Sequence, residues 1–168
     1  MTSTPRQLRL GSEVRSRGDI AAVEAVIAYW AAQDVEMTVS MFADDIVYQL
    51  YVSRSAQHIC IERTGRSAVR SMLYDLLADF DYLSYEADIL EVNNGVARVH
   101  TSYIMRHRAT GDELAGSKRF VCTLKNGLFT RLHEYHDAAL VEAFMKLAKW
   151  RLGEQEQPAS IESVIRSR

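Results

Sequence analysis

The chain of 168 residues has little cysteine and no long apolar run. Cys60 and Cys122 are its two cysteines and form no Cys-x-x-Cys pair, so the sequence indicates neither a disulfide framework nor a cysteine zinc site. No stretch approaches the roughly 18 apolar residues of a membrane span, and residues 1–18 lack the apolar segment of a signal peptide. We therefore expect reduced thiols and a cytoplasmic protein.

An excess of one charge is also missing. The chain has 20 basic and 22 acidic residues, which removes the basic surface expected of a nucleic-acid-binding protein. No Gly-x-Gly-x-x-Gly, phosphate-binding loop or Gly-x-Ser-x-Gly elbow occurs. We therefore expect no nucleic-acid or membrane partner, no nucleotide or other cofactor, and no serine-hydrolase chemistry.

The length and the hydrophobic content of 48% predict a single domain, since domains cluster at about 100–150 residues. Residues 1–18 hold arginines among Ser, Thr and Gly with little periodicity, and are predicted to form a flexible N-terminal arm. Asp19 is the expected N-cap of the first helix. The folded domain is predicted at 19–150, followed by a polar C-terminal tail at 151–168.

Apolar residues at helical spacing predict four helices. They are expected at 19–33, from Asp34 to a turn at Asp44-Asp45, from Thr64-Gly65 to about residue 80, and at 138–150. Asp34 and Asp137 are the expected N-caps of the second and last helices. One strand is predicted at 46–52, and a short second strand is an option at 58–62.

The strongest local signal is a series of three hairpin turns between β-forming runs. They are Asn93-Asn94-Gly95, Thr110-Gly111-Asp112 and Lys125-Asn126-Gly127. They predict a meander of strands at 83–92, 96–108, 113–124 and 128–136. The expected fold class is α+β, with one curved antiparallel or mixed sheet wrapped around helices and enclosing a pocket.

Alternation along two of these strands predicts which side chains face the interior. The interior set is Ala97, Val99, Thr101, Tyr103 and Met105 on one strand, and Leu128, Thr130, Leu132, Glu134 and His136 on the other. The opposite faces mix Arg, His and aromatic side chains, which suits a homodimer interface. His133 and His136 are three apart on a strand and point to opposite faces, so no metal site is expected.

Four sequence patterns carry a family resemblance. They are Ala31-Ala32-Gln33-Asp34, Met41-Phe42-Ala43-Asp44-Asp45-Ile46-Val47-Tyr48, Gly65-Arg66-Ser67-Ala68-Val69 and His133-Glu134-Tyr135-His136-Asp137. Over residues 19–150 the chain resembles the nuclear-transport-factor-2-like (NTF2-like) superfamily, and within it the SnoaL-like branch with its steroid isomerases, polyketide cyclases and limonene epoxide hydrolases. The resemblance implies a cone-shaped α+β roll, cystatin-like in form, with a deep apolar pocket.

Functional residues of these relatives carry over only in part. The carboxylate base of steroid isomerases falls at Leu50, their oxyanion tyrosine at Val26 and their second carboxylic acid near Ser117. Without a base or an oxyanion donor, isomerase chemistry of that kind is not expected.

The epoxide hydrolases match somewhat better. Their water-positioning tyrosine falls at Tyr48, although the asparagine that follows two residues later is Leu50. Their Asp-Arg-Asp relay falls at Tyr103, Thr101 and Glu134, which keeps one charged residue of three. Epoxide opening by the same route is therefore not expected.

These observations predict a pocket protein that binds a small, largely apolar molecule of polyketide, terpenoid or steroid-like type. Acid-base isomerase, cyclase or hydrolase chemistry is an option, and the sequence leaves open whether the chain is an enzyme. Glu134 and His136 share a strand face and are the candidate catalytic pair. The candidate ligand-binding residues are Tyr48, Leu50, Tyr103, Trp30 and Thr101.

The alternative is a non-catalytic binding or structural subunit of a larger complex. Residues 102–108 and 111–119 resemble the small subunit of ring-hydroxylating dioxygenases, which is chiefly structural. Such a subunit would use the outer sheet face, with contacts from Arg98, Arg106, Arg131 and Tyr135.

Overall fold

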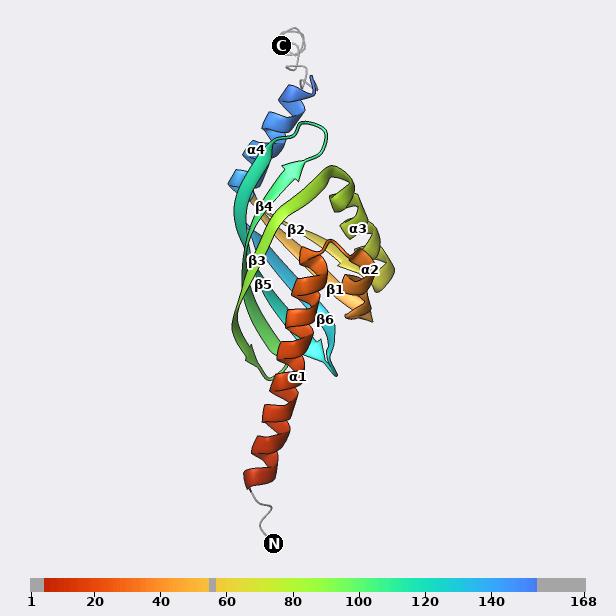
Figure 1. Ribbon diagram of the computed structural model, residues 1–168, viewed down its shortest axis with the longest axis vertical. Helices are drawn as coiled ribbons and strands as arrows, with labels where there is room; N and C mark the ends of the chain where they lie inside the picture. The colour runs from red at the N-terminus through yellow and green to blue at the C-terminus, as the bar shows by residue number, and fades with distance from the viewer. Residues whose placement is uncertain (1–4, 55–56, 154–168) are drawn as a thin grey trace, which may run out of the picture.

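The computed structural model describes residues 5–54 and 57–153, and its helices and strands belong to one curled sheet with helices against it (Figure 1). The helices are α1 (Pro5–Ala31), α2 (Val35–Ser40), α3 (Arg66–Asp79) and α4 (Ala138–Arg151). The strands are β1 (Phe42–Arg54), β2 (Gln57–Thr64), β3 (Phe80–Asn93), β4 (Val96–His107), β5 (Glu113–Lys125) and β6 (Leu128–His136).

The sheet has the strand order β2-β1-β6-β5-β4-β3. Strands β1 and β6 are parallel, and every other pair is antiparallel, which makes the sheet mixed. Since β2 and β3 are its two edges, the sheet is curled without closing into a barrel. The prediction of an α+β fold with a curved mixed sheet around helices is confirmed.

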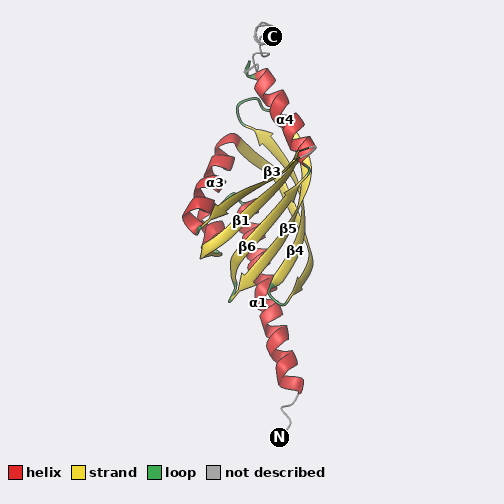
Figure 2. Cartoon of the chain, turned by 180° about the vertical axis from the view of Figure 1, so that it is seen from behind, coloured by secondary structure: helices red, strands yellow, loops and turns green. Residues whose placement is uncertain are grey.

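The helices divide the molecule into layers. Helices α1, α2 and α3 lie on one side of the curled sheet and α4 lies at one of its ends (Figure 1). Seen from behind, the strands face the viewer, α1 passes behind them and α3 lies at the left edge (Figure 2). The concave side of the sheet is therefore the side where a core or a pocket can form.

Two of the predicted hairpins have the expected Asn-Gly turns. Asn94 and Asn126 have φ of 51° and 53°, and the glycines that follow them have φ of 74° and 76°. Positive φ at both central residues defines the turn that best matches the twist of the flanking strands. A Cβ on Gly95 would lie 2.8 Å from the carbonyl oxygen of Leu124, so this position also requires glycine for space.

Irregular pairing interrupts the alternation in β6. On β6, Phe129 pairs with Leu124 and Arg131 with Thr123, which leaves Thr130 as an extra residue. The faces are exchanged before that point, so Phe129 is buried and Leu128 is 37% exposed. The interior prediction is therefore wrong for Leu128, because of this bulge.

Downstream of the bulge the predicted alternation holds. Leu132 and Glu134 are buried on the concave side. On β4, which pairs regularly with β5, the predicted interior residues are all buried: Ala97, Val99, Thr101, Tyr103 and Met105.

Three predicted boundaries differ in the structure. Helix α1 begins at Pro5, so it includes residues assigned to the N-terminal arm, and Asp19 lies inside the helix and not at its N-cap. The N-terminal part of α1 extends past the sheet (Figure 1), where no core imposes an apolar stripe on the sequence. Asp44-Asp45 lies within β1 and forms no turn between elements.

Other boundaries agree with the sequence. Asp34 caps α2 by accepting a hydrogen bond from the Met37 backbone N–H at 2.9 Å, and Asp137 caps α4 by accepting from Leu140 at 3.3 Å. Both N-cap predictions are confirmed. Residues 154–168 of the predicted C-terminal tail lie outside the described residues. Within the described residues, no helix has the length and apolar character needed to cross a bilayer.

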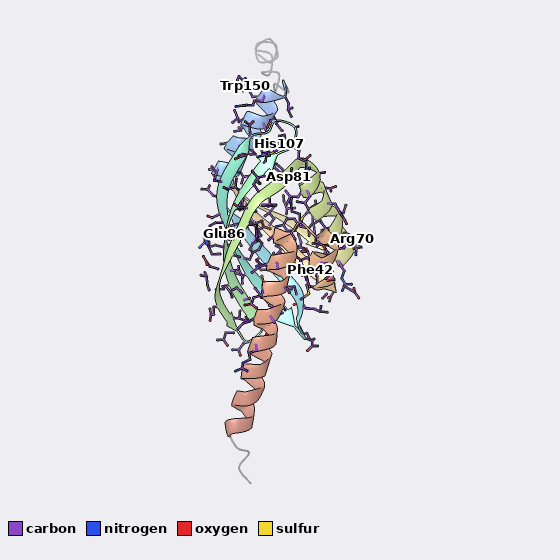
Figure 3. All side chains as sticks on the ribbon, in the orientation of Figure 1. Phe42, Arg70, Asp81, Glu86, His107 and Trp150 are labelled. Atoms are coloured by element: carbon purple, nitrogen blue, oxygen red, sulfur yellow. The ribbon has the colours of Figure 1, made fainter. Side chains whose placement is uncertain are left out.

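Aromatic contacts join the helices to the sheet. Trp30 of α1 meets Tyr82 of β3 edge to face, with ring centroids 5.6 Å apart. Within the sheet, Phe42 of β1 and Phe129 of β6 make a similar contact at 5.9 Å, and Phe42 lies in the middle of the molecule (Figure 3). Trp150, by contrast, lies at the far end of α4 and is 65% exposed (Figure 3). The apolar core therefore lies between the concave face and the helices.

Candidate functional site

A cavity of about 420 Å³ lies between the concave face of the sheet and the helices. Its volume is within the roughly 300–1,000 Å³ typical of small-molecule sites, and most of its lining is aliphatic or aromatic. All predicted site residues line it: Trp30, Tyr48, Leu50, Thr101, Tyr103, Glu134 and His136. The structure brings these residues to one cavity, and their individual roles stay predictions.

Glu134 is the centre of the polar groups in this cavity. Its Oε1 lies 2.8 Å from Nζ of Lys118 and 2.7 Å from Nε2 of His136, and its Oε2 accepts a hydrogen bond from the Tyr48 hydroxyl. The Glu134 side chain is 6% exposed. A buried carboxylate needs such partners, because it has lost its hydration. The arrangement holds the carboxylate in one position.

The strand register explains why these groups meet. Glu134 and His136 are two apart on β6 and share its concave face. Lys118 of β5 is paired with His136 across the β5–β6 ladder, and Leu50 of β1 is paired with Glu134 on the other side. Three adjacent strands of the sheet therefore supply the polar cluster.

His136 is oriented by Glu134 and leaves one ring nitrogen available. Its Nε2 contacts the carboxylate, whereas its Nδ1 is buried and has no hydrogen-bond partner among the described residues. A neutral imidazole with Nε2–H donating to a carboxylate carries its lone pair on Nδ1. His136 as a residue lines the cavity, and this unpartnered nitrogen is its candidate proton acceptor.

Lys118 is a functional candidate that the sequence reasoning missed. Its side chain is 3% exposed, and the rings of Tyr82, Tyr85, Tyr103 and Phe120 have centroids 5.1–5.6 Å from its Nζ. These distances fall within the roughly 6 Å of cation–π attraction. Burial lowers the pKa of Lys118 to about 7. The cavity wall thus contains an amine close to its titration point at neutral pH.

The signal that would have found Lys118 is strand parity at 113–125. One face of that segment carries Leu114, Lys118, Phe120, Cys122 and Leu124, and all five are buried. A lysine within an otherwise apolar strand face predicts a buried amine. Ser117, where the second acid of steroid isomerases falls, is exposed on the opposite face.

The missed aromatic residues have a different cause. Tyr82 and Tyr85 are three apart, yet both line the cavity, because the register of β3 shifts between Tyr82 and Ser84. Simple alternation places such a pair on opposite faces. The bulge therefore brings two rings to Lys118 that the sequence pattern separates.

The buried tyrosines and the buried thiol stay uncharged at neutral pH. Burial raises the pKa values of Tyr82, Tyr85 and Tyr103, so these side chains remain neutral hydroxyl donors. Burial also raises the pKa of the Cys122 thiol to about 12, which removes its reactive thiolate form.

The outer face carries the residues of the alternative prediction. Arg98 and Arg106 form ion pairs with Glu91 and Glu113 at 2.8 and 2.7 Å. The Tyr135 ring is stacked on the Tyr51 ring, with 4.8 Å between their centroids. A homodimer or a partner at this face stays a prediction. Within residues 5–54 and 57–153, no group of three or more His, Cys, Asp and Glu residues is placed to hold a metal ion.

Solved structures share this fold at low identity. TerC co-crystallised with polyporic acid is 16% identical over 77% of this chain and 97% of its own, with a TM-score of 0.61. A ketosteroid isomerase-like protein from Catenulispora acidiphila in complex with trimethylamine is 16% identical over 73% and 89%, with a TM-score of 0.57. An NTF2-like protein from Burkholderia xenovorans is 15% identical over 76% and 95%, also with a TM-score of 0.57.

These identities show a common fold and nothing more specific. No curated protein matches this chain with statistical significance. Residues 23–132, more than half of the chain, match the SnoaL-like domain family. The resemblance noted in the sequence is thereby confirmed, and the chain belongs to the SnoaL-like domain family.

Proposed function

We propose that the chain binds a small, largely apolar molecule of polyketide, terpenoid or steroid-like type in its cavity and catalyses proton transfer on it. The observation that carries this proposal is the buried Nδ1 of His136, which has no partner among the described residues while Nε2 is held by Glu134. The apolar lining and the volume of the cavity support such a ligand. Structures of the same fold that contain polyporic acid or trimethylamine also support it.

In the proposed reaction, His136 is the base. Its Nδ1 takes a proton from a carbon next to a carbonyl group of the substrate, and the Glu134 carboxylate stabilises the imidazolium that forms. Tyr103 lines the same cavity and supplies a neutral hydroxyl to the substrate oxygen where negative charge develops. Tyr48 donates to Glu134 and keeps the carboxylate in place. General acid-base catalysis of this kind contributes about 10²–10⁴-fold to a rate.

A thermal-shift screen against steroid, polyketide and terpenoid ketones tests the binding step. A ligand present at about 100 times its dissociation constant raises the free energy of unfolding by about 2.7 kcal/mol. Proton transfer is then followed by NMR as the incorporation of deuterium from D₂O into the bound ketone.

The variants that test the catalytic pair and their control variant all lie on β6. His136→Ala and Glu134→Gln should slow the exchange at least about 100-fold. His133→Ala, which removes a ring that lies against Tyr51, should leave the exchange unchanged. If a ketone binds without any exchange in the wild type, or if His136→Ala exchanges at the wild-type rate, catalysis by this pair is wrong.

A further inference from the structure

The proposed proton transfer leaves one reactive group of the cavity without a chemical role. All four lysines of the chain lie in the described residues, and Lys118 is the buried one, while Lys125, Lys146 and Lys149 are exposed. The Lys118 side chain lines the cavity that the ligand would occupy. A buried lysine is costly to retain unless it has a partner, and here the partner is Glu134. A primary amine in an apolar cavity has a characteristic reaction with carbonyl compounds.

We propose that Lys118 forms an imine with an apolar aldehyde or ketone bound in the cavity. Lys118 lines the cavity, and its Nζ lies 2.8 Å from the Glu134 carboxylate and is surrounded by four aromatic rings. The inference rests on the proposed function for the place of the ligand, and it adds the substrate class and a covalent step.

The surroundings of Lys118 suit the product of this reaction. A protonated imine carries its positive charge at the same nitrogen as the ammonium group. The rings of Tyr82, Tyr85, Tyr103 and Phe120 and the Glu134 carboxylate, which already surround that cation, therefore also stabilise the iminium. No new charge has to be buried when the imine forms.

Burial of the Lys118 side chain makes its amine available as a nucleophile. Burial lowers the pKa of Lys118 to about 7, so a substantial share of the side chain is the neutral amine at neutral pH. Desolvation of a lysine in an apolar pocket is a known way to activate it toward carbonyl groups. An exposed lysine with an ordinary pKa of about 10.4 is almost wholly protonated under these conditions.

Glu134 can carry the proton through the whole step. The Lys118 ammonium passes one proton to the carboxylate at 2.8 Å, and the freed electron pair attacks the carbonyl carbon to form a C–N bond. A second N–H proton moves to the former carbonyl oxygen, which gives a carbinolamine. Glu134 then returns its proton to that oxygen, the C–O bond breaks, and water leaves. Ammonium and carbonyl compound are converted to iminium and water, with Glu134 unchanged.

Reductive trapping tests this inference. The wild-type protein is incubated at pH 7 with benzaldehyde, cinnamaldehyde or citral and with sodium cyanoborohydride, which converts an imine into a stable amine. Intact-mass spectrometry counts the adducts, and peptide mapping assigns them among the four lysines and the N-terminus. We expect one adduct per chain with at least one aldehyde, at Lys118, and at least ten times more of it than at any exposed lysine.

Two variants and the exposed lysines provide the controls. Lys118→Arg keeps a positive charge but cannot form an imine, and should lose the adduct. Lys146→Arg changes a side chain that is 75% exposed and should keep the adduct. Because the wild-type peptide map compares lysines within one sample, the result does not depend on how well Lys118→Arg folds. Labelling spread evenly over the exposed lysines, or no labelling of Lys118 by any of the three aldehydes, would overturn the inference.

The corresponding alcohols separate this inference from the proposed function. Benzyl alcohol, cinnamyl alcohol and geraniol resemble the three aldehydes in shape but have no carbonyl group. If an alcohol stabilises the protein in a thermal-shift assay while no aldehyde labels Lys118, the covalent step is wrong and ligand binding in the cavity stands. If neither the alcohols nor the aldehydes bind, both proposals fail for this class of molecule.

Discussion

At the residue scale, the cavity depends on the placement of one carboxylate. Glu134 receives contacts from Lys118, His136 and Tyr48, and it therefore links an amine, an imidazole and a phenol. Buried ion pairs contribute little net stability when compared with apolar residues of similar size, yet removing one partner is expensive. The cluster is therefore weak evidence for stability, and the proposed function assigns it a chemical role.

A double-mutant cycle on Lys118 and Glu134 tests this coupling. At pH 6, Lys118→Met should lower the free energy of unfolding by about 3 kcal/mol, because it leaves a buried carboxylate without its cation. The double variant Lys118→Met, Glu134→Gln should lose much less than the sum of the two single variants. Urea denaturation gives the four free energies. Strict additivity would show that the two side chains do not interact.

The same cycle should depend on pH in a definite direction. Burial lowers the pKa of Lys118 to about 7, so the ammonium loses its proton as the pH rises through that value. The coupling energy at pH 9 should therefore be smaller than at pH 6. Tyr82, Tyr85 and Tyr103 have raised pKa values and stay neutral over this interval, while His136 also faces Glu134. Repeating the cycle in a His136→Gln background removes that contribution.

At the scale of the elements, strand alternation explains which parts of the site the sequence could predict. It correctly placed the interior residues of β4, because β4 pairs regularly with β5. It failed at Leu128, where a bulge adds one residue without a distinctive sequence. The cap residues Asp34 and Asp137 were predictable from residue type, whereas the start of α1 was not, since that segment has no apolar stripe.

One cross-strand pair shapes the cavity wall and leads to a prediction. Tyr103 of β4 is paired with Gly116 of β5, and a Cβ on Gly116 would lie 2.7 Å from the Tyr103 hydroxyl oxygen. Gly116→Ala should displace the Tyr103 ring and lower the free energy of unfolding by about 1–3 kcal/mol, measured by urea denaturation. The neighbouring exposed Ser117→Ala should change it by less than about 0.5 kcal/mol.

The tyrosine ring itself provides the control for this pair. In a Tyr103→Ala background the added methyl group of Gly116→Ala has space, so the substitution should cost little. An equal cost in both backgrounds would show that the glycine is needed for a reason other than the ring.

At the scale of the whole molecule, the family resemblance predicted a curved sheet that encloses a pocket. It did not predict which side chains could carry out chemistry there. The seven candidate residues line one cavity because they lie on the concave faces of β1, β4 and β6 and on α1. Lys118 was missed because alternation was not applied to its strand. Lys118 and Glu134 lie on the neighbouring strands β5 and β6, whereas Tyr48 of β1 is 86 residues from Glu134, so no pattern within a single segment indicates that the three side chains meet.

The most direct measurement of the central claim is isothermal titration calorimetry with the best ligand of the thermal-shift screen. We predict one molecule bound per chain and a negative heat-capacity change, because apolar surface is buried. Leu50→Trp, which fills part of the cavity beside Glu134, should weaken binding at least about tenfold, while Ile104→Trp at an exposed position should not. Equal affinities for the wild type and Leu50→Trp would show that the ligand binds elsewhere and would contradict the account.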